Sequence, residues 1–205
     1  MSKIAIIGAT GRVGHHLMEE ALRRGHTITA LARNATGKAA GHPSVTARDV
    51  DVQNAEELER AVTRHDAVFS AARFKDVPPR AIIDPVKRAP VMRLLVVGGA
   101  ASLLVPSGQR LLDTPTFPSE HRAEAAAGVN FLETLRQEKE LDWTFVSPSA
   151  LFIEGPRTGQ FRLGNDELLV DAGNKSWISF ADYAIAFLDE FEQHAHSRRR
   201  FTVGY

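Results

Sequence analysis

Apolar positions along the chain follow two patterns that alternate. Short apolar runs rich in β-branched residues are typical of buried strands, and between them apolar residues recur every three or four positions, as on one face of a helix. Buried strands that alternate with helices predict an α/β fold in which a doubly wound parallel sheet carries helices on both faces. The runs that predict strands cover residues 4–7, 27–32, 45–48, 66–72, 93–99 and 143–148.

Local signals predict where several helices begin and end. Asn54, with Glu57 three residues later, predicts a helix start, and Gly25 is expected to cap the end of the first helix. Pro85 lies inside a helical pattern and is expected to shorten or kink that helix. The helical faces comprise Val13, Leu17 and Ala21; Leu58, Ala61 and Val62; Ala81, Ile82 and Val86; Phe131, Leu132 and Leu135; and Ala184, Phe187, Leu188 and Phe191.

The pattern changes after Phe152 to short strands and turns. A helix is expected from about Ser179, with Asp182 as its capping partner, and this capping position accounts for Asp182 without a catalytic role. Further short strands are expected at residues 159–163, 168–170 and 200–203. A chain of 205 residues is long enough for one well-buried core, so we expect a single domain.

Composition excludes several classes of function. The 25 basic and 25 acidic residues leave no net field that would attract nucleic acid or an anionic membrane. The absence of cysteine excludes disulfides and a thiolate nucleophile, and the eight histidines lack ligand spacing, so we expect no metal. The first apolar run is too short for a membrane span and leads into a glycine turn, so we expect a cytoplasmic protein. The arginines at 198–200 are expected to form a solvated cluster.

Three glycines follow the first strand with the spacing G-x-x-G-x-x-G, and a helical pattern begins directly after them. Gly8 would allow the tight turn, Gly11 would let a pyrophosphate approach the backbone, and Gly14 would let the helix pack on the strand. A helix start offers unpaired N–H groups and a partial positive charge, which suit a pyrophosphate. The alternative is a glycine turn without a ligand.

The end of the second strand predicts which dinucleotide binds. An acidic residue there would accept a hydrogen bond from the ribose 2′-hydroxyl of NAD, whereas an arginine accommodates the 2′-phosphate of NADP. The chain has Arg33 at this place, and no acidic residue occurs between Glu20 and Asp49. The sequence therefore favours NADP (NADPH) over NAD, with Arg12 and Lys38 as further phosphate contacts. The alternative is that Arg33 is an exposed cation with no ligand.

Together the segments 7–14, 31–34, 49–51, 96–100 and 143–148 resemble the atypical short-chain dehydrogenase/reductases, and within them the NmrA-like, NAD(P)H-binding branch that includes proteins of the NADH-flavin reductase type. The resemblance covers essentially the whole chain and implies a nucleotide-binding Rossmann core at about residues 1–150 and a substrate-side extension at about 151–205. By position it implies that Gly8, Thr10, Gly11, Arg12 and Val13 line the pyrophosphate, Arg33 the 2′-phosphate, Asp49 and Val50 the adenine, and Ala71 the nicotinamide side.

Small residues at the end of the fourth strand, Ala71 and Ala72, leave room for a flat ring, although packing alone could explain their size. Pro148, at the end of the sixth strand, is also assigned to the cofactor site. No residue with the spacing of a metal ligand accompanies them.

The wider superfamily uses a Tyr-x-x-x-Lys pair on the helix after the fifth strand as its acid catalyst. Residues 119–125 contain neither tyrosine nor lysine, and neither Tyr183 nor Tyr205 has a lysine four residues later. Two polar candidates remain. Ser102 follows the fifth strand and would bind the substrate or the carboxamide, unless it only caps the next turn. His121 lies roughly where the tyrosine would fall and could donate a proton, unless it is simply solvent-exposed.

Two hypotheses about function follow. The first is an NADPH-dependent oxidoreductase that transfers a hydride to a flavin, a quinone or a similar planar acceptor, which needs little help from an acid catalyst. The second is a regulatory module that binds NADP(H), turns nothing over and signals through a partner protein. A sugar-nucleotide epimerase or dehydratase is a weaker third option, because the general acid is missing. In each case we expect a monomer or homodimer.

Overall fold

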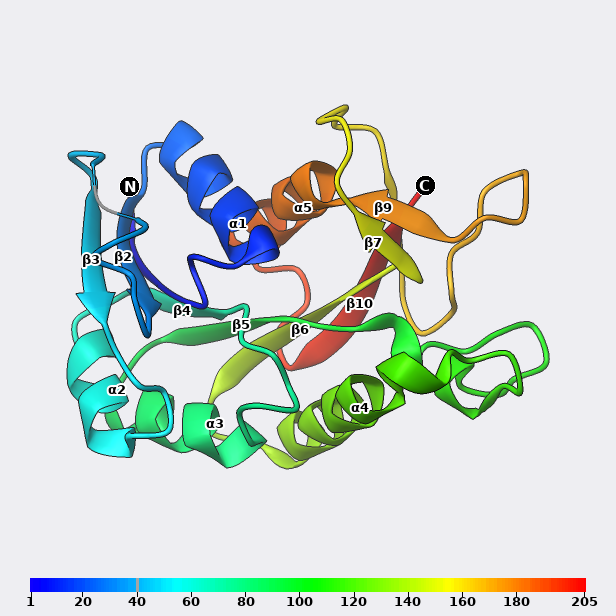
Figure 1. Cartoon of the computed structure of the whole chain (residues 1–205), viewed down its shortest axis with the longest axis horizontal. Helices are drawn as coiled ribbons and strands as arrows, with labels where there is room; N and C mark the ends of the chain where they lie inside the picture. Colours follow the sequence, from blue (N-terminus) through cyan, green and yellow to red (C-terminus); the bar gives the residue numbers. More distant parts are fainter. Residues whose placement is uncertain (40) are drawn as a thin grey trace.

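The computed structural model describes residues 1–39 and 41–205, and its centre is an eight-stranded sheet (Figure 1). The strand order is β3-β2-β1-β4-β5-β6-β10-β8, and every neighbouring pair is parallel except β10 with β8. The chain runs from β1 outward to β3 and then crosses back to β4, so the order reverses between β1 and β4. The strands are β1 (Lys3–Ile7), β2 (Thr27–Ala32), β3 (Val45–Asp49), β4 (Ala67–Ser70), β5 (Arg93–Val97), β6 (Asp142–Pro148), β8 (Arg162–Gly164) and β10 (Arg199–Gly204).

Helices cover both faces of this sheet (Figure 1). The helices α1 (Arg12–Arg23) and α5 (Phe180–Gln193) pack on one face, and α2 (Ala55–Val62), α3 (Pro79–Arg88) and α4 (Arg122–Gln137) pack on the other. Side chains alternate between the faces along a strand. In β1, Ile4 and Ile6 join the first core cluster, whereas Ala5 and Ile7 join the second. Burial on both faces explains the continuous apolar runs in the sequence and confirms the predicted fold class.

The C-terminal extension contributes to the same sheet, because β10 pairs with β6 and β8 pairs with β10. A separate two-stranded ribbon joins β7 (Leu151–Ile153) to β9 (Trp177–Ser179). Three short 3₁₀ helices precede α4: η1 (Ala100–Ser102), η2 (Leu111–Asp113) and η3 (Ser119–His121). No helix in the described ranges, 1–39 and 41–205, has the length and apolar character to cross a membrane.

Several local predictions are confirmed. The Asn54 side chain accepts a hydrogen bond from the backbone N–H of Glu57 at 3.2 Å, and the Ser179 hydroxyl accepts one from the N–H of Asp182 at 3.0 Å. Both contacts satisfy a helix-start donor that has no partner within its helix. Gly25 also ends α1 as predicted, because it follows the C-cap residue Arg24 with φ of +80° and its N–H donates to the Leu22 carbonyl at 2.9 Å.

Other local predictions are not confirmed. Pro85 does not end its helix: α3 runs through it to Arg88, because burial of the apolar face outweighs the lost hydrogen bond. Residues 168–170 form no strand, and only the end of the predicted strand at 159–163 belongs to β8. Arg200, expected in solvent, is 8% exposed.

Candidate functional site

The turn between β1 and α1 explains two of the three glycines by backbone packing. Gly8 has φ of +76°, and a Cβ atom there would lie 2.7 Å from the carbonyl oxygen of Ala71. A Cβ at Gly14 would collide with the Gly8 carbonyl, so α1 can start this close to β1 only with glycine. Gly11 is different: its φ is −77°, which any residue adopts, and its nearest neighbour would be the Gly8 oxygen at 3.2 Å.

The N-terminus of α1 offers an anion site. Gly11 is the N-cap and supplies no side-chain acceptor, and no acidic residue lies in the first turn. The first intrahelical bond runs from the N–H of His15 to the carbonyl of Gly11, so the N–H groups of Arg12 and Val13 have no partner within the helix. These donors and the positive end of the helix dipole suit a pyrophosphate. The helix start therefore fits the central group of a dinucleotide cofactor.

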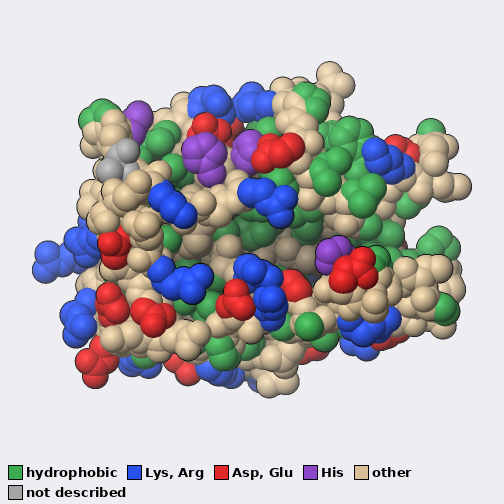
Figure 2. Space-filling view, viewed as in Figure 1, with side chains coloured by type: hydrophobic (Ala, Val, Ile, Leu, Met, Phe, Trp, Pro, Cys, Tyr) green, Lys and Arg blue, Asp and Glu red, His purple; other side chains and the backbone are tan. Residues whose placement is uncertain are grey.

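A cavity of about 560 Å³ lies at the carboxyl ends of β1 to β4, next to this helix start. Figure 2 shows the face hollowed along its middle, between α1 and α5 above and α3 and α4 below, with Lys and Arg side chains on both sides. In an open α/β sheet, ligands bind at this edge where the strand order reverses. The residues expected from the sequence that line this first cavity are Gly8, Thr10, Gly11, Arg33, Val50, Ala71 and Ala72.

The end of the first cavity near β2 is lined by Arg33 and Lys38. Both side chains are exposed, and neither forms an ion pair with any residue in the described part of the chain. Arg73 also lines the cavity but lies 3.8 Å from the carboxylate of Asp76. Two cations without an acidic partner at the strand end are well placed for an additional phosphate.

Four residues expected at the cofactor lie outside the lining of this cavity: Asp49, Arg12, Val13 and Pro148. The Asp49 carboxylate turns to Thr36, accepting from its N–H at 2.9 Å and its hydroxyl at 2.8 Å, and these bonds lower the pKa of Asp49. The Arg12 guanidinium lies 5.7 Å from the centre of the Phe180 ring, and Val13 packs against the core. Arg12 and Val13 therefore face the first cavity only through their backbone at the helix start.

A second cavity of about 500 Å³ lies at the carboxyl ends of β5 and β6. It contains both predicted catalytic residues, Ser102 and His121, and Pro148 lines it instead of the first cavity. The Ser102 hydroxyl accepts a hydrogen bond from the Arg200 guanidinium at 3.2 Å, so Ser102 is held in place by a buried cation. His121 ends η3, next to α4, and is exposed.

Aromatic side chains give the second cavity its walls, and the sequence did not single them out. They are Phe74, Phe117 and Phe152. Each lies in a loop or a three-residue strand, where no periodicity marks it. The only sequence signal was the pair of glycines after β5, because Gly98 and Gly99 leave the strand end open.

The two cavities share the segment 71–77. Ala71, Ala72 and Val77 line the first cavity, while Phe74 lines the second. The Glu124 carboxylate of α4 fixes this segment, because it accepts from the backbone N–H of Phe74 at 2.8 Å and from that of Lys75 at 3.0 Å. The Phe74 ring lies against Gly128, where a Cβ would be 2.9 Å from it.

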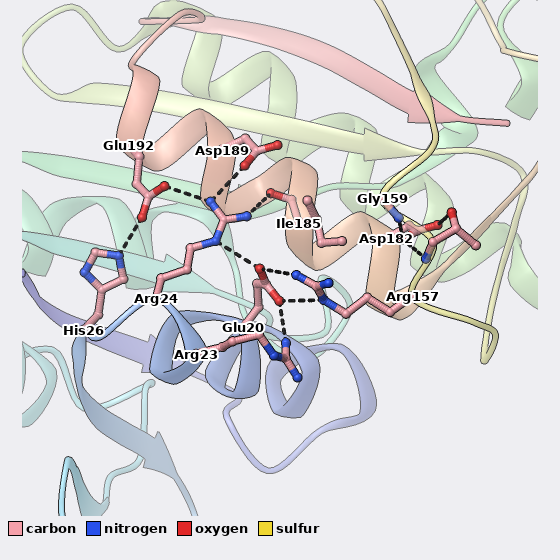
Figure 3. Close-up of polar contacts among 11 residues, drawn as sticks. Glu20, Arg23, Arg24, His26, Arg157, Gly159, Asp182, Ile185, Asp189 and Glu192 are labelled. Carbon is pink, nitrogen blue, oxygen red and sulfur yellow. Dashed lines mark hydrogen bonds and ion pairs between the residues drawn. The ribbon is translucent and has the colours of Figure 1, made fainter.

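Charged side chains hold the segment 154–160 against α1 and α5 (Figure 3). The Arg157 guanidinium donates to both carboxylate oxygens of the buried Glu20 at 3.0 Å. Burial alone would raise the pKa of Glu20, but hydrogen bonds from three arginines outweigh it and lower this pKa. The buried Asp182 carboxylate accepts from the N–H groups of Thr158 and Gly159 at 2.7 and 2.8 Å, so Asp182 does more than mark a helix start.

The comparisons with known proteins agree with this geometry. The model of a family described as NAD(P)H-binding matches residues 8–191. The chain belongs to this NAD(P)H-binding family. This membership confirms the resemblance inferred from the sequence. Within residues 1–39 and 41–205, no group of three His, Asp or Glu side chains could hold a metal ion.

Several solved structures and a sequence relative resemble the whole chain. YwnB of Bacillus subtilis, an uncharacterized protein, is 41% identical over 98% of this chain and 97% of its own. A protein of Bacteroides thetaiotaomicron provisionally described as an epimerase is 41% identical, with a TM-score of 0.94 over 100% of this chain and 97% of its own. One of Streptococcus pneumoniae, provisionally described as an NADH-flavin reductase, is 36% identical, with a TM-score of 0.86 over 100% and 99%.

Proposed function

We propose that the protein is an NADPH-dependent reductase that passes a hydride to a flavin, a quinone or a similar planar acceptor. The observation that carries this proposal is the pair of adjoining cavities at one sheet edge: the first has a helix start and cations, and the second has aromatic walls. Bound NADPH would supply the hydride from its nicotinamide ring. The description of the Streptococcus pneumoniae relative as an NADH-flavin reductase supports the same reaction class.

In this proposal the role of the protein is to bind the cofactor and the acceptor and to orient them for hydride transfer. The N–H groups at the start of α1 hold the pyrophosphate, and Arg33 with Lys38 pairs the 2′-phosphate, which favours NADP over NAD. The small side chains of Ala71 and Ala72 leave room for a ring beside the second cavity. Holding two reactants in one geometry supplies much of the rate enhancement that such a reaction needs.

Two polar groups of the second cavity would act on the acceptor. The Ser102 hydroxyl, which accepts from Arg200, can donate its own proton in a hydrogen bond to an acceptor oxygen or nitrogen. His121 is exposed, so it can take a proton from solvent and pass it to the reduced acceptor. With the hydride that bound NADPH would supply, this proton would complete a two-electron reduction of the acceptor.

The lining argues against epimerase chemistry. The superfamily's acid catalyst is a tyrosine with a lysine four residues later, and no tyrosine or lysine is among the described residues that line the second cavity. Tyr183 is fully buried and donates its hydroxyl to the Val146 carbonyl at 2.7 Å. The lack of a tyrosine–lysine pair is equally compatible with the second candidate, a sensor that binds NADP(H) without turnover.

One experiment separates the two candidates. Oxidation of NADPH is followed by its absorbance with FMN, riboflavin or a quinone as acceptor, and NADPH binding is measured separately by calorimetry. Turnover with at least one acceptor, faster with NADPH than with NADH, is the expected result. Tight NADPH binding with no turnover on any acceptor would instead identify the sensor.

A further inference from the structure

The second cavity differs from the first in charge. The first is lined by three cations, Arg33, Lys38 and Arg73, and by the carboxylates of Asp51 and Asp76. The second has three aromatic rings, a floor of glycine and alanine after β5, and only two ionisable lining residues, His121 and Glu124. Among the described residues, no lysine or arginine side chain lines it.

The charged groups around the second cavity are already engaged. Both oxygens of Glu124 accept backbone N–H groups of the segment 71–77. The Arg200 guanidinium, which reaches Ser102, forms an ion pair with Asp166. The Arg122 guanidinium lies 5.6 Å from the Phe117 ring centre, donates to the Leu112 carbonyl and is not part of the lining.

An anionic group placed in this cavity would lose water and find no lysine or arginine in the described lining, while the exposed His121 offers at most a solvent-screened contact, so its desolvation is costly. An uncharged ring would instead lie between aromatic walls at no such cost. We propose that the second cavity selects uncharged planar acceptors: a neutral quinone, or a flavin whose isoalloxazine ring enters while its phosphate stays outside. This inference rests on the proposed reductase function and names its substrate class.

The test compares acceptors that differ in charge. Naphthoquinone is expected to have a kcat/KM at least about tenfold above that of its sulfonate, and riboflavin is expected to match FMN, because the phosphate finds no cation. A sulfonate also changes the intrinsic reactivity of a quinone. Binding of both quinones is therefore measured by calorimetry on protein loaded with NADP⁺, where no hydride is available.

A variant that adds a cation to the cavity separates the effect of charge from other differences between the quinone and its sulfonate. Thr116 is an exposed residue of the lining, and Thr116→Lys places a positive charge there. The ratio of sulfonate to naphthoquinone affinity is expected to rise about fivefold in Thr116→Lys, the size of an exposed ion pair, and to stay unchanged in the uncharged control Thr116→Gln.

The outcomes separate this inference from the proposed function. Equal or tighter binding of the sulfonate by the unmodified protein, or a ratio that Thr116→Lys leaves unchanged, would overturn the selection of uncharged acceptors. Charge-selective binding without reduction of any acceptor would support the selection and refute the reductase function.

Discussion

Among the three glycines of the β1–α1 turn, Gly11 is the one that backbone packing requires least. Its backbone is extended, and a Cβ would meet only the Gly8 oxygen at 3.2 Å. Gly11→Asp should therefore fold but place a side chain and a negative charge where the pyrophosphate approaches. We expect NADPH binding to fall below detection in a calorimetric titration while the circular dichroism spectrum is retained. Gly11→Ala, which adds no charge, should bind more weakly than the unmodified protein but measurably. Unchanged NADPH affinity in Gly11→Asp would remove the basis of the cofactor assignment.

Arg33 tests the choice of cofactor apart from its binding. A charge-assisted contact to the 2′-phosphate at an exposed strand end should make Arg33→Ala bind NADPH about ten- to a hundredfold more weakly, while NADH is hardly affected. Arg33→Asp should invert the preference, because a carboxylate repels the phosphate and accepts from a 2′-hydroxyl. Both affinities are measured at one fixed ionic strength. Arg48, exposed on the neighbouring β3 and outside the cavity lining, is the matched control. Equal losses for both cofactors in Arg33→Ala would mean that Arg33 is structural.

Single residues could be predicted from the sequence where their role is local. Gly8, Gly11 and Arg33 lie at fixed offsets from a strand end, and the structure places them together in one cavity. Arg200 could not be predicted, because its partners Asp166 and Ser102 are 34 and 98 residues away in sequence. Asp182 shows both cases: its capping position is local, but its carboxylate binds Thr158 and Gly159, which lie on a distant loop.

Among the elements, the segment 154–160 connects α1 and α5 to the strand whose Phe152 lines the second cavity. It follows β7, whose Phe152 lines that cavity and packs against Phe180 with ring centres 4.6 Å apart. Glu20 of α1 and Asp182 of α5 hold the segment from two helices (Figure 3). The position of Phe152 therefore depends in part on these two carboxylates, besides its packing on Phe180 and the pairing of β7 with β9.

Removing the Asp182 carboxylate should release this segment. Asp182→Ala leaves buried donors unsatisfied and should lower the free energy of unfolding by about 2–3 kcal/mol, measured in urea. Proteolysis at residues 154–160 should accelerate, and the KM of the acceptor should rise while NADPH affinity is retained. Asp189→Ala on the same helix removes a part-exposed partner of Arg24 and should cost less than about 1 kcal/mol. A similar loss in both variants would contradict a special role for Asp182.

Glu20 should make stability depend on pH. Its folded pKa is lowered from an ordinary value of about 4.5, so its stabilising contribution is complete above that value and is lost as the pH falls through the folded pKa. Glu20→Gln lacks this contribution, so its free energy of unfolding in urea should fall less steeply with acid below about pH 4.5. Glu19→Gln changes a neighbouring carboxylate that is half exposed and should follow the unmodified protein. Parallel pH curves for Glu20→Gln and the unmodified protein would refute this assignment.

The long strands and helices could be predicted because each shows an apolar run or apolar residues at helical spacing. Strands of three residues are too short to show either pattern. The strands β1 to β6 were found from apolar runs, whereas β7 and β9 have three residues each and pair only with one another. Pro85 shows the limit of local rules, since Ile82, Ile83 and Val86 are buried against the sheet and keep α3 helical.

At the scale of the whole molecule, the sheet explains why both cavities meet. Strands buried on two faces must be covered by helices on both sides, which the alternating pattern predicts. All loops that follow the parallel strands then lie at one edge, and the first cavity forms at the ends of β1 to β4 and the second at those of β5 and β6. The pattern of apolar residues does not contain the pairing of β10 with β6 and β8, so the position of Arg200 behind Ser102 became visible only in the structure.

This arrangement predicts the order of events in turnover. The two cavities have separate linings and meet at the segment 71–77, so cofactor and acceptor can be bound at the same time. Direct hydride transfer then requires a ternary complex. Initial rates measured against NADPH at several fixed acceptor concentrations should give reciprocal plots that intersect. Saturating NADP⁺ in the first cavity should leave the acceptor affinity, measured by calorimetry, within about threefold of its value in the free protein, because neither ligand displaces the other.

Parallel reciprocal plots would instead indicate that cofactor and acceptor do not bind at the same time. Parallel reciprocal plots arise when the first product leaves before the second substrate binds, which would require the protein to store the two electrons in between. A tightly bound flavin in the second cavity could store them. Such a flavin is detected by its visible absorbance in the purified protein. Intersecting plots from a colourless protein would establish transfer across the segment 71–77 directly from NADPH to the acceptor.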